Sequence, residues 1–315
     1  MANQGRPKYA FLNGDIVPIE QATVGVMTHA LHYGTAVFGG LRGYWNDTEE
    51  QLYVMRPHDH FKRLLSSASL LRMNFDYTPE GLTDILMQLL RTESFHENCY
   101  IRPLMYKSTE MIGVRIHDVA DGFTMFALPF GRYVDNEEGA HVCFSSWVRV
   151  EDNAIPARGK ISGAYANSSL IKSDAILSGY DEAITLNQDG HISEMSAANI
   201  FLVRDGKVYT PGVADNILEG ITRRSIIQLL REELHLEVIE RNIDRTEVYI
   251  SDELFMCGTG VQVAAITRVE HRQIGDGAMG EITQAIRNLY FDVVSGRVEK
   301  YRHWLTPVYI KEAVS

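Results

Sequence analysis

One lysine of the chain lies in an unusual local sequence. Lys160 sits in a run of small residues, 157–165 (ARGKISGAY), with glycine close by on both sides. Glycine lets a backbone approach a ligand closely, and a catalytic amine needs such a special setting. The alternative is an exposed lysine in a flexible loop, which is the commoner environment of this residue. Lys107, at the end of an apolar segment, is the other lysine that the pattern allows to be buried.

Two further segments have the pattern of anion-binding sites. Residues 218–222 (LEGIT) lead into a predicted helix that Thr222 caps and that ends near His235. The free N–H groups and positive dipole end of a helix N-terminus can bind a phosphate, although plain capping is the more common use of such a sequence. Residues 258–260 (GTG) follow a predicted strand over 251–257 and form either a second anion-binding nest or a tight turn.

One acidic residue precedes a run of small side chains. Glu194 follows the predicted strand 191–193 and is followed by Ser196, Ala197 and Ala198. Such a carboxylate either neutralises a buried cation or is a solvated charge at the end of a strand. The cysteines, at positions 99, 143 and 257, are far apart and have no zinc-ligand spacing. We therefore predict no metal site, and we interpret the cysteines as buried thiols in a reducing compartment.

The composition limits the class of protein. The chain has 315 residues, 45% of them hydrophobic and 23% charged, which is enough for two domains. Its net charge of -11 argues against a nucleic-acid partner, because phosphate neutralisation supplies most of that affinity. No apolar run approaches the roughly 20 residues of a membrane span, and the polar N-terminus is not a secretory signal. We expect a cytoplasmic protein without a membrane partner.

Helices and strands are mixed along the sequence. Helices are predicted from Pro57, from Thr78-Pro79 and over 167–178, and hairpin turns at 189–190 and 205–206. Hairpins are too frequent for a doubly wound parallel sheet, so the predicted class is α+β in two domains. We predict a small N-terminal α/β domain over 1–129, an acidic interdomain loop over 130–140 and a large C-terminal domain over 141–315.

Several segments, taken in order, resemble the branched-chain aminotransferases, which are fold type IV pyridoxal-phosphate enzymes. The similarity runs from about Tyr9 to Trp304. The segments that carry it are 27–35 (MTHALHYGT), 100–104 (YIRPL), 145–147 (SSW), 192–194 (ISE), 220–223 (GITR) and 255–259 (FMCGT). The resemblance implies a smaller N-terminal domain and a larger C-terminal domain that binds the cofactor, pyridoxal 5'-phosphate, which would lie between them.

The resemblance also implies roles for the residues that bind the cofactor. Lys160 would form the internal Schiff base and then move the proton between the substrate α-carbon and C4′ of the cofactor. Glu194 would pair with the pyridine nitrogen and keep it protonated, so that the ring can absorb electrons. Tyr165 would bind the phenolic oxygen. The remaining cofactor-binding residues, which would hold the phosphate or lie beside it, are Arg63, Leu218, Ile221, Thr222 and Thr259.

The substrate pocket follows from the same resemblance. Arg102, with the hydroxyls of Tyr33 and Tyr133, would take the side-chain carboxylate of glutamate. Val114 matches a position that the neighbouring subunit usually contributes, which implies a homodimer or a higher homo-oligomer. The full set of residues implied to bind the substrate is Tyr33, Phe38, Arg42, Tyr100, Arg102, Val114, Phe130, Tyr133, Thr259 and Gly260.

The implied reaction moves an amino group between branched-chain amino acids (Leu, Ile, Val) and 2-oxoglutarate. Two departures from the family pattern leave alternatives open. Gly39 stands where the family usually has glutamate, and Ala198 where an acid often follows the pyridine-binding segment. A pocket without these acids is expected to be roomier and less committed to an α-carboxylate. The alternatives are an (R)-selective amine or D-amino acid transaminase, and an aminodeoxychorismate lyase.

Overall fold

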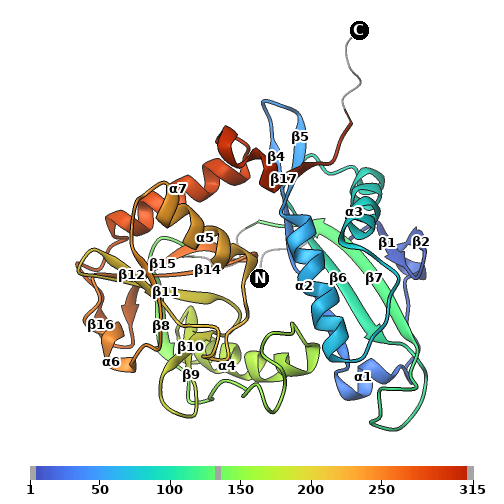
Figure 1. Ribbon diagram of the computed structural model, residues 1–315, viewed down its shortest axis with the longest axis horizontal. Coiled ribbons are helices and arrows are strands. Elements are labelled where there is room, and N and C mark those ends of the chain that lie inside the picture. Colours follow the sequence, from blue (N-terminus) through green and yellow to red (C-terminus); the bar gives the residue numbers. More distant parts are fainter. Residues whose placement is uncertain (1–4, 132–135, 311–315) are drawn as a thin grey trace. The chain divides into compact units, whose positions relative to one another are not determined.

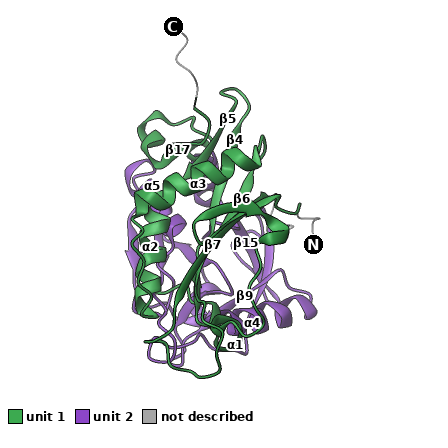
Figure 2. Cartoon of the chain, turned by 90° about the vertical axis from the view of Figure 1, so that its right-hand side faces the viewer, with its two compact units in different colours: residues 1–131, 159–163, 292–315 green, residues 132–158, 164–291 purple. Residues whose placement is uncertain are grey.

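The computed structural model describes residues 5–131 and 136–310. Tyr133 and part of the expected 130–140 loop lie outside the described residues. The chain divides into two compact units, coloured separately in Figure 2. Unit 1 comprises Met1–Gly131, Gly159–Gly163 and Asp292–Ser315, and unit 2 comprises Arg132–Arg158 and Ala164–Phe291.

The units differ from the predicted domain ranges in two segments. Residues 159–163 belong to unit 1, where Ile161 forms a bridge with Val37. The C-terminal segment also belongs to unit 1, because its last strand pairs with an N-terminal one, Leu305 opposite Met55. Both differences arise from pairings between residues far apart in sequence, which local patterns do not reveal.

Unit 1 is built on one sheet whose described strands number eight, in the order β17-β5-β4-β6-β7-β1-β2, with β3 paired to β6. The strands are β1 (Tyr9–Leu12), β2 (Asp15–Pro18), β3 (Ala36–Phe38), β4 (Leu41–Asn46), β5 (Gln51–Met55), β6 (Cys99–Lys107), β7 (Asp121–Pro129) and β17 (Leu305–Pro307). The helices are α1 (His29–Tyr33), α2 (Pro57–Leu70) and α3 (Pro79–Glu93), with short 3-10 turns at Ile19–Gln21 and Glu299–Trp304.

Local sequence explains a tight turn and a helix start in unit 1. Asn13 and Gly14 have the positive φ that a tight hairpin requires, so β1 turns directly into β2. Thr78 caps α3 by accepting a hydrogen bond from the Gly81 N–H. Helices α2 and α3 contact each other and the sheet, α2 against β3 and β6, and α3 against β1 and β7 (Figure 1).

Unit 2 is built on a second, larger sheet in the order β10-β9-β8-β15-β14-β11-β12-β13, with β16 paired to β15. The strands are β8 (Ala140–Phe144), β9 (Glu182–Leu186), β10 (Ile192–Met195), β11 (Asn199–Arg204), β12 (Lys207–Thr210), β13 (Val238–Glu240), β14 (Glu253–Gly258), β15 (Gln262–Val269) and β16 (Arg272–Gln273). The helices are α4 (Tyr165–Leu177), α5 (Ile221–Glu232), α6 (Arg245–Val248) and α7 (Glu281–Val294), and a 3-10 turn, Ser162–Ala164, precedes α4.

Helix α5 begins two residues earlier than predicted. Gly220 is its N-cap residue, and no side chain caps it, so the prediction that Thr222 caps this helix is wrong. Thr222 lies in the first turn and is buried. Helix α5 contacts β13 and β14, and α4 contacts β9.

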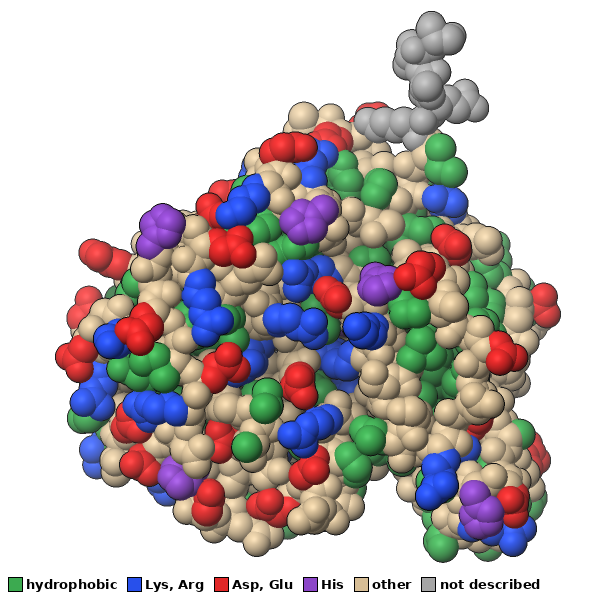
Figure 3. Space-filling view, viewed as in Figure 1, with side chains coloured by type: hydrophobic (Ala, Val, Ile, Leu, Met, Phe, Trp, Pro, Cys, Tyr) green, Lys and Arg blue, Asp and Glu red, His purple; other side chains and the backbone are tan. Residues whose placement is uncertain are grey.

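Charges of both signs are mixed over the surface of unit 2. Lys207 pairs with Glu237, Arg241 with Glu247 and Arg245 with Glu270. Figure 3 shows acidic and basic side chains interspersed over the left-hand part of this face. The negative net charge therefore does not form a single acidic field there.

The α+β class is confirmed, because each unit combines a mainly antiparallel sheet with helices. Among residues 5–131 and 136–310, no helix is long and apolar enough to span a bilayer. The same residues contain no cluster of three or more His, Cys, Asp or Glu side chains that could hold a metal ion.

Candidate active site

The main chain of Lys160 is fixed by two elements of unit 1. The Phe38 N–H at the end of β3 donates to the Lys160 carbonyl at 3.0 Å. The Lys160 N–H donates to the Ser67 Oγ of α2 at 3.2 Å, and Ser67 in turn donates to the carbonyl of Arg63 at 2.8 Å. Lys160 thus contacts Ser67, which lies one helical turn after Arg63, the predicted phosphate ligand.

Two cations lie over the ring of Phe38. The Lys160 Nζ is 5.0 Å from the ring centroid and the Arg102 Cζ is 4.6 Å from it. Both contacts fall within the range of cation–π attraction. Unit 1 therefore brings together an amine, a guanidinium and an apolar wall, which suits a site for an acid with an aliphatic side chain.

Tyr100 and Phe130 extend this aromatic surface. The Arg102 Nη2 donates to the Tyr100 hydroxyl at 3.0 Å, and the Tyr100 and Phe130 rings lie 5.1 Å apart. Arg42 stacks 5.1 Å from the centroid of Phe130 and donates to the carbonyls of Phe130 and Gly131. Arg42 therefore orients the segment after β7.

The glycine at position 39 does not open the pocket as predicted. A Cβ at Gly39 would lie 2.7 Å from the Cγ of Pro103, a distance that real Cβ atoms essentially never show. The proline ring therefore fills the space into which a side chain at this position would begin. Likewise, a Cβ at Gly40 would lie 2.2 Å from the Tyr100 hydroxyl, so both glycines permit close packing.

Lys107, the second lysine that the sequence singled out, has a structural role. Lys107 is 1% exposed, and its Nζ contacts Asp121 at 2.8 Å and donates to the carbonyl of Arg72 at 2.9 Å. An ammonium group held in this way is not available as a nucleophile.

The cysteines are also unsuited to nucleophilic chemistry. Burial raises the pKa of Cys99 and of Cys257 to about 12 and that of Cys143 to about 11. The three thiols therefore stay protonated near neutral pH, whereas the thiolate is the reactive form.

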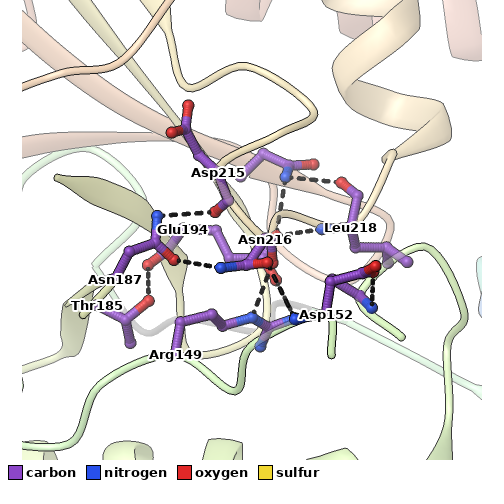
Figure 4. A network of polar contacts seen from close by, with 10 residues as sticks. Arg149, Asp152, Thr185, Asn187, Glu194, Asp215, Asn216 and Leu218 are labelled. Atoms are coloured by element: carbon purple, nitrogen blue, oxygen red, sulfur yellow. Dashed lines mark hydrogen bonds and ion pairs between the residues drawn. The ribbon is translucent and has the colours of Figure 1, made fainter. Parts of the chain in front are cut away.

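Glu194 lies in unit 2 at the centre of a polar network, shown in Figure 4. Its side chain is almost fully buried, at 4% exposure for the residue. The Arg149 Nη2 lies 2.8 Å from Oε1, and Oε2 accepts from the Asn199 Nδ2 at 3.0 Å and the Leu218 N–H at 3.1 Å. These three donors favour the ionised carboxylate, so the solvated strand-end alternative does not describe this residue.

The other predicted cofactor residues of unit 2 lie on neighbouring elements. Leu218 touches Glu194 directly, and Ile221 and Thr222 form the first turn of α5 three to four residues later. Thr259 follows β14, whose Cys257 lies opposite Asn199 of β11. Tyr165 begins α4.

The predicted substrate residues near α1 belong to unit 1. The Tyr33 hydroxyl accepts from the Gly113 N–H at 2.9 Å, beside Val114, which is 78% exposed. Buried His29 holds the same loop, with its Nε2 2.8 Å from the Gly113 carbonyl. These contacts give His29 a structural role.

Arg149 and Asn199 are the partners of Glu194 that the sequence did not indicate. Asn199 lies five residues after Glu194 at the start of the next strand, β11, so a polar residue directly after the run of small residues is a signal that could have been used. Arg149 lies in a segment without regular structure. We find no sequence signal that connects it to Glu194.

Comparison with known proteins shows the family of the chain. Residues 37–269 match the family model described as Amino-transferase class IV. The probable branched-chain-amino-acid aminotransferase of Aquifex aeolicus is 44% identical over 96% of this chain and 97% of its own length. The chain belongs to the branched-chain aminotransferase family. The motifs quoted above predicted this membership, and it is confirmed.

Solved structures of this family have the same fold. The branched-chain amino acid aminotransferase of Thermobaculum terrenum, solved in its PLP form, matches with a TM-score of 0.92 and 38% identity over 98% of this chain and 100% of that one. The branched-chain aminotransferase of Thermoproteus uzoniensis with norvaline matches with a TM-score of 0.92 and 39% identity over 96% and 100%. The predicted fold type IV architecture is confirmed.

Proposed function

We propose that the protein transfers an amino group between the branched-chain amino acids leucine, isoleucine and valine and 2-oxoglutarate, with pyridoxal phosphate as cofactor. The observation that carries the proposal is the placement of the Lys160 amine and the Arg102 guanidinium over one ring, that of Phe38. An amine for the chemistry and a cation for a second carboxylate then share one apolar site. The solved relatives that bind PLP and norvaline support this choice of cofactor and substrate class.

The donor groups fit the cofactor. A buried carboxylate held ionised by three donors, Glu194, suits a protonated pyridine nitrogen. Helix α5 starts without a side-chain cap, so the N–H groups of Ile221 and Thr222 suit a phosphate. We assign Arg63 and Thr259 to the same phosphate, Leu218 to the ring region and the Tyr165 hydroxyl to the phenolic oxygen.

The chemistry divides between the cofactor and the protein. When bound, pyridoxal phosphate supplies an aldehyde that links to an amine and a ring that absorbs an electron pair. Lys160 would hold the aldehyde carbon through its Nζ. Once the substrate amine has displaced it from that carbon, the freed Nζ would take the proton from the substrate α-carbon. Glu194 holds the proton on the pyridine nitrogen.

The substrate would be held mainly by residues of unit 1. Phe38, Tyr100 and Phe130 provide apolar walls, and Arg102 provides the cation for the distal carboxylate of glutamate. Tyr33, Arg42, Tyr133, Thr259 and Gly260 complete the proposed pocket.

A substrate panel tests the proposal. Purified protein is assayed with 2-oxoglutarate and, in turn, L-leucine, L-isoleucine, L-valine, D-alanine and (R)-1-phenylethylamine, and glutamate formation is measured. We expect the three L-amino acids to react fastest. Faster reaction of D-alanine or of the amine would contradict the proposed substrate class.

Removing Arg102 should separate the two classes of substrate. Breaking a buried charged contact costs about 2–5 kcal/mol, so we expect Arg102→Leu to raise the KM for 2-oxoglutarate by on the order of 30-fold or more. The half-reaction with L-leucine should change much less, because its side chain carries no charge. Stopped-flow spectra of each half-reaction measure both effects.

Arg102→Lys is the matched control for charge. It should retain part of the affinity for 2-oxoglutarate. If Arg102→Leu slows both half-reactions equally, the arginine supports the structure of the site and does not bind the distal carboxylate of the substrate.

We also propose that the protein is a homodimer, whose partner subunit would receive Val114. Four large apolar residues of unit 1, Val26, Leu31, Ile112 and Val114, are 65–80% exposed. Their two segments are joined by the bridge between Thr28 and Glu110. Exposed apolar clusters of this kind mark protein interfaces.

Sedimentation measures this directly. The wild-type protein should have twice the mass of one chain or more, and Leu31→Asp combined with Ile112→Asp should reduce it to the mass of one chain. A wild-type monomer would contradict the dimer.

The three unpaired cysteines suit a reducing compartment, and the cytoplasm is our proposed location.

A further inference from the structure

Arg149 is a charged donor to the Glu194 carboxylate, which also accepts from the Asn199 side chain and the Leu218 N–H. Its side chain is 11% exposed and that of Glu194 is 6% exposed, so the ion pair is nearly dry. Removing one partner of such a pair leaves the other charge buried and uncompensated. The orientation and ionisation of Glu194 therefore depend on an arginine that belongs to no motif of the sequence.

Arg149 is itself held in place from two sides. Its main-chain N–H donates to the Leu186 carbonyl at 2.8 Å, and its side-chain Nε donates to the Asn216 carbonyl at 3.1 Å. Asn216 has a φ of 55°, a left-handed conformation that asparagine tolerates. The Asn216 side chain donates to Glu151 at 2.9 Å and to Asn187 at 3.0 Å. These contacts leave the guanidinium little rotational freedom (Figure 4).

The same network reaches the start of α5. The Leu218 N–H donates to the Glu194 Oε2, while the Leu218 carbonyl accepts from the Asn199 Nδ2 at 3.1 Å. Gly220 follows two residues later as the N-cap of α5. A Cβ at Gly220 would lie 2.2 Å from the Asn199 Oδ1, so the helix start packs directly against the amide that holds Glu194.

We propose that Arg149 is a positioning residue that, together with Asn199 and the 216–220 segment, fixes the Glu194 carboxylate relative to the start of α5. This inference rests on the proposed function, in which Glu194 pairs with the pyridine nitrogen and the start of α5 binds the phosphate. The network then acts as a rigid template within unit 2 that keeps these two groups at a fixed separation. Arg149 also keeps Glu194 ionised, so that the shared proton stays on the pyridine nitrogen.

Cofactor release from the holoenzyme tests this role without reference to turnover. Release is followed by the loss of the visible band while a phosphatase removes free pyridoxal phosphate, and the circular dichroism of the bound band reports cofactor orientation. We expect Arg149→Met to release the cofactor about tenfold to a hundredfold faster, the range found for residues that orient a binding side chain. The dichroism per bound cofactor should fall, and Arg149→Lys should recover part of both.

Three further variants isolate the cause. Arg241→Met removes another arginine–glutamate pair of unit 2, with Glu247, and should release cofactor at the wild-type rate. In a Glu194→Gln background, Arg149→Met should raise the cofactor release rate little further, because the carboxylate that Arg149 pairs with is already gone. Gly220→Ala should also speed release, since it displaces Asn199 from the other side of the carboxylate.

The outcomes distinguish this inference from the proposed function. In one outcome, the wild-type protein shows the visible band while Arg149→Met releases the cofactor no faster than Arg241→Met does. That result would overturn the inference and leave the proposed function intact. In another, Arg149→Met raises the release rate by the same factor in the wild-type and in the Glu194→Gln background. That result would overturn the inference too, since Arg149 would then act independently of Glu194. A wild-type protein that binds no pyridoxal phosphate would overturn the proposed function and this inference together.

Discussion

Lys160→Ala is expected to lower kcat by on the order of 10⁴-fold, because it removes both the covalent link to the cofactor and the base that moves the α-proton. The fold should survive. The contacts that hold this loop use the main chain of Lys160, with the Phe38 N–H and the Ser67 Oγ, and these remain in the variant. Steady-state kcat and the thermal unfolding temperature are the measurements.

Lys207→Ala is the matched control. Lys207 is an exposed lysine of β12 paired with Glu237, and its loss should leave kcat unchanged. If Lys160→Ala keeps wild-type turnover while folded, Lys160 is not the catalytic amine. Lys107 would not replace it, because its ammonium is held by Asp121 and by main-chain carbonyls.

Glu194→Gln should lower kcat by about 10²–10⁴-fold, the range of acid–base and electrostatic contributions. A neutral amide cannot hold a proton on the pyridine nitrogen. The variant also leaves Arg149 without its carboxylate, so the thermal unfolding temperature should fall as well. Turnover is therefore measured per bound cofactor, which separates slower chemistry from weaker binding.

Glu247→Gln provides the comparison for this effect. Glu247 pairs with Arg241 in unit 2 and has a pKa lowered mainly by that hydrogen bond. Its replacement should cost some stability and leave turnover per cofactor unchanged. An unchanged kcat in Glu194→Gln would mean that this buried carboxylate has only a structural role.

Local sequence predicted the parts of the site that short patterns specify. The run around Lys160 and the helix starts at Pro57 and Pro79 follow from glycine freedom and from the preference of proline for the first helical turn. Glu194 was left open between a buried and a solvated charge, because one acid at a strand end fits both. Only the family resemblance assigned its role.

The remaining features depend on tertiary contacts. Arg149 reaches Glu194 across 45 positions of sequence, and the last strand β17 joins the sheet of unit 1 beside β5. Gly39 was interpreted as a source of extra room because a missing side chain suggests a void, but Pro103 occupies the space. Thr222 was taken as a cap, although Gly220 takes that position.

Reduction with borohydride tests the central claim most directly. The holoenzyme is treated with borohydride, digested, and its peptides are mapped by mass spectrometry. If Lys160 holds pyridoxal phosphate, the reduced cofactor is fixed irreversibly to the peptide that contains Lys160, and Lys160→Ala yields no adduct. An adduct on Lys107 or Lys172, or a cofactor that is released intact after reduction, would contradict the account.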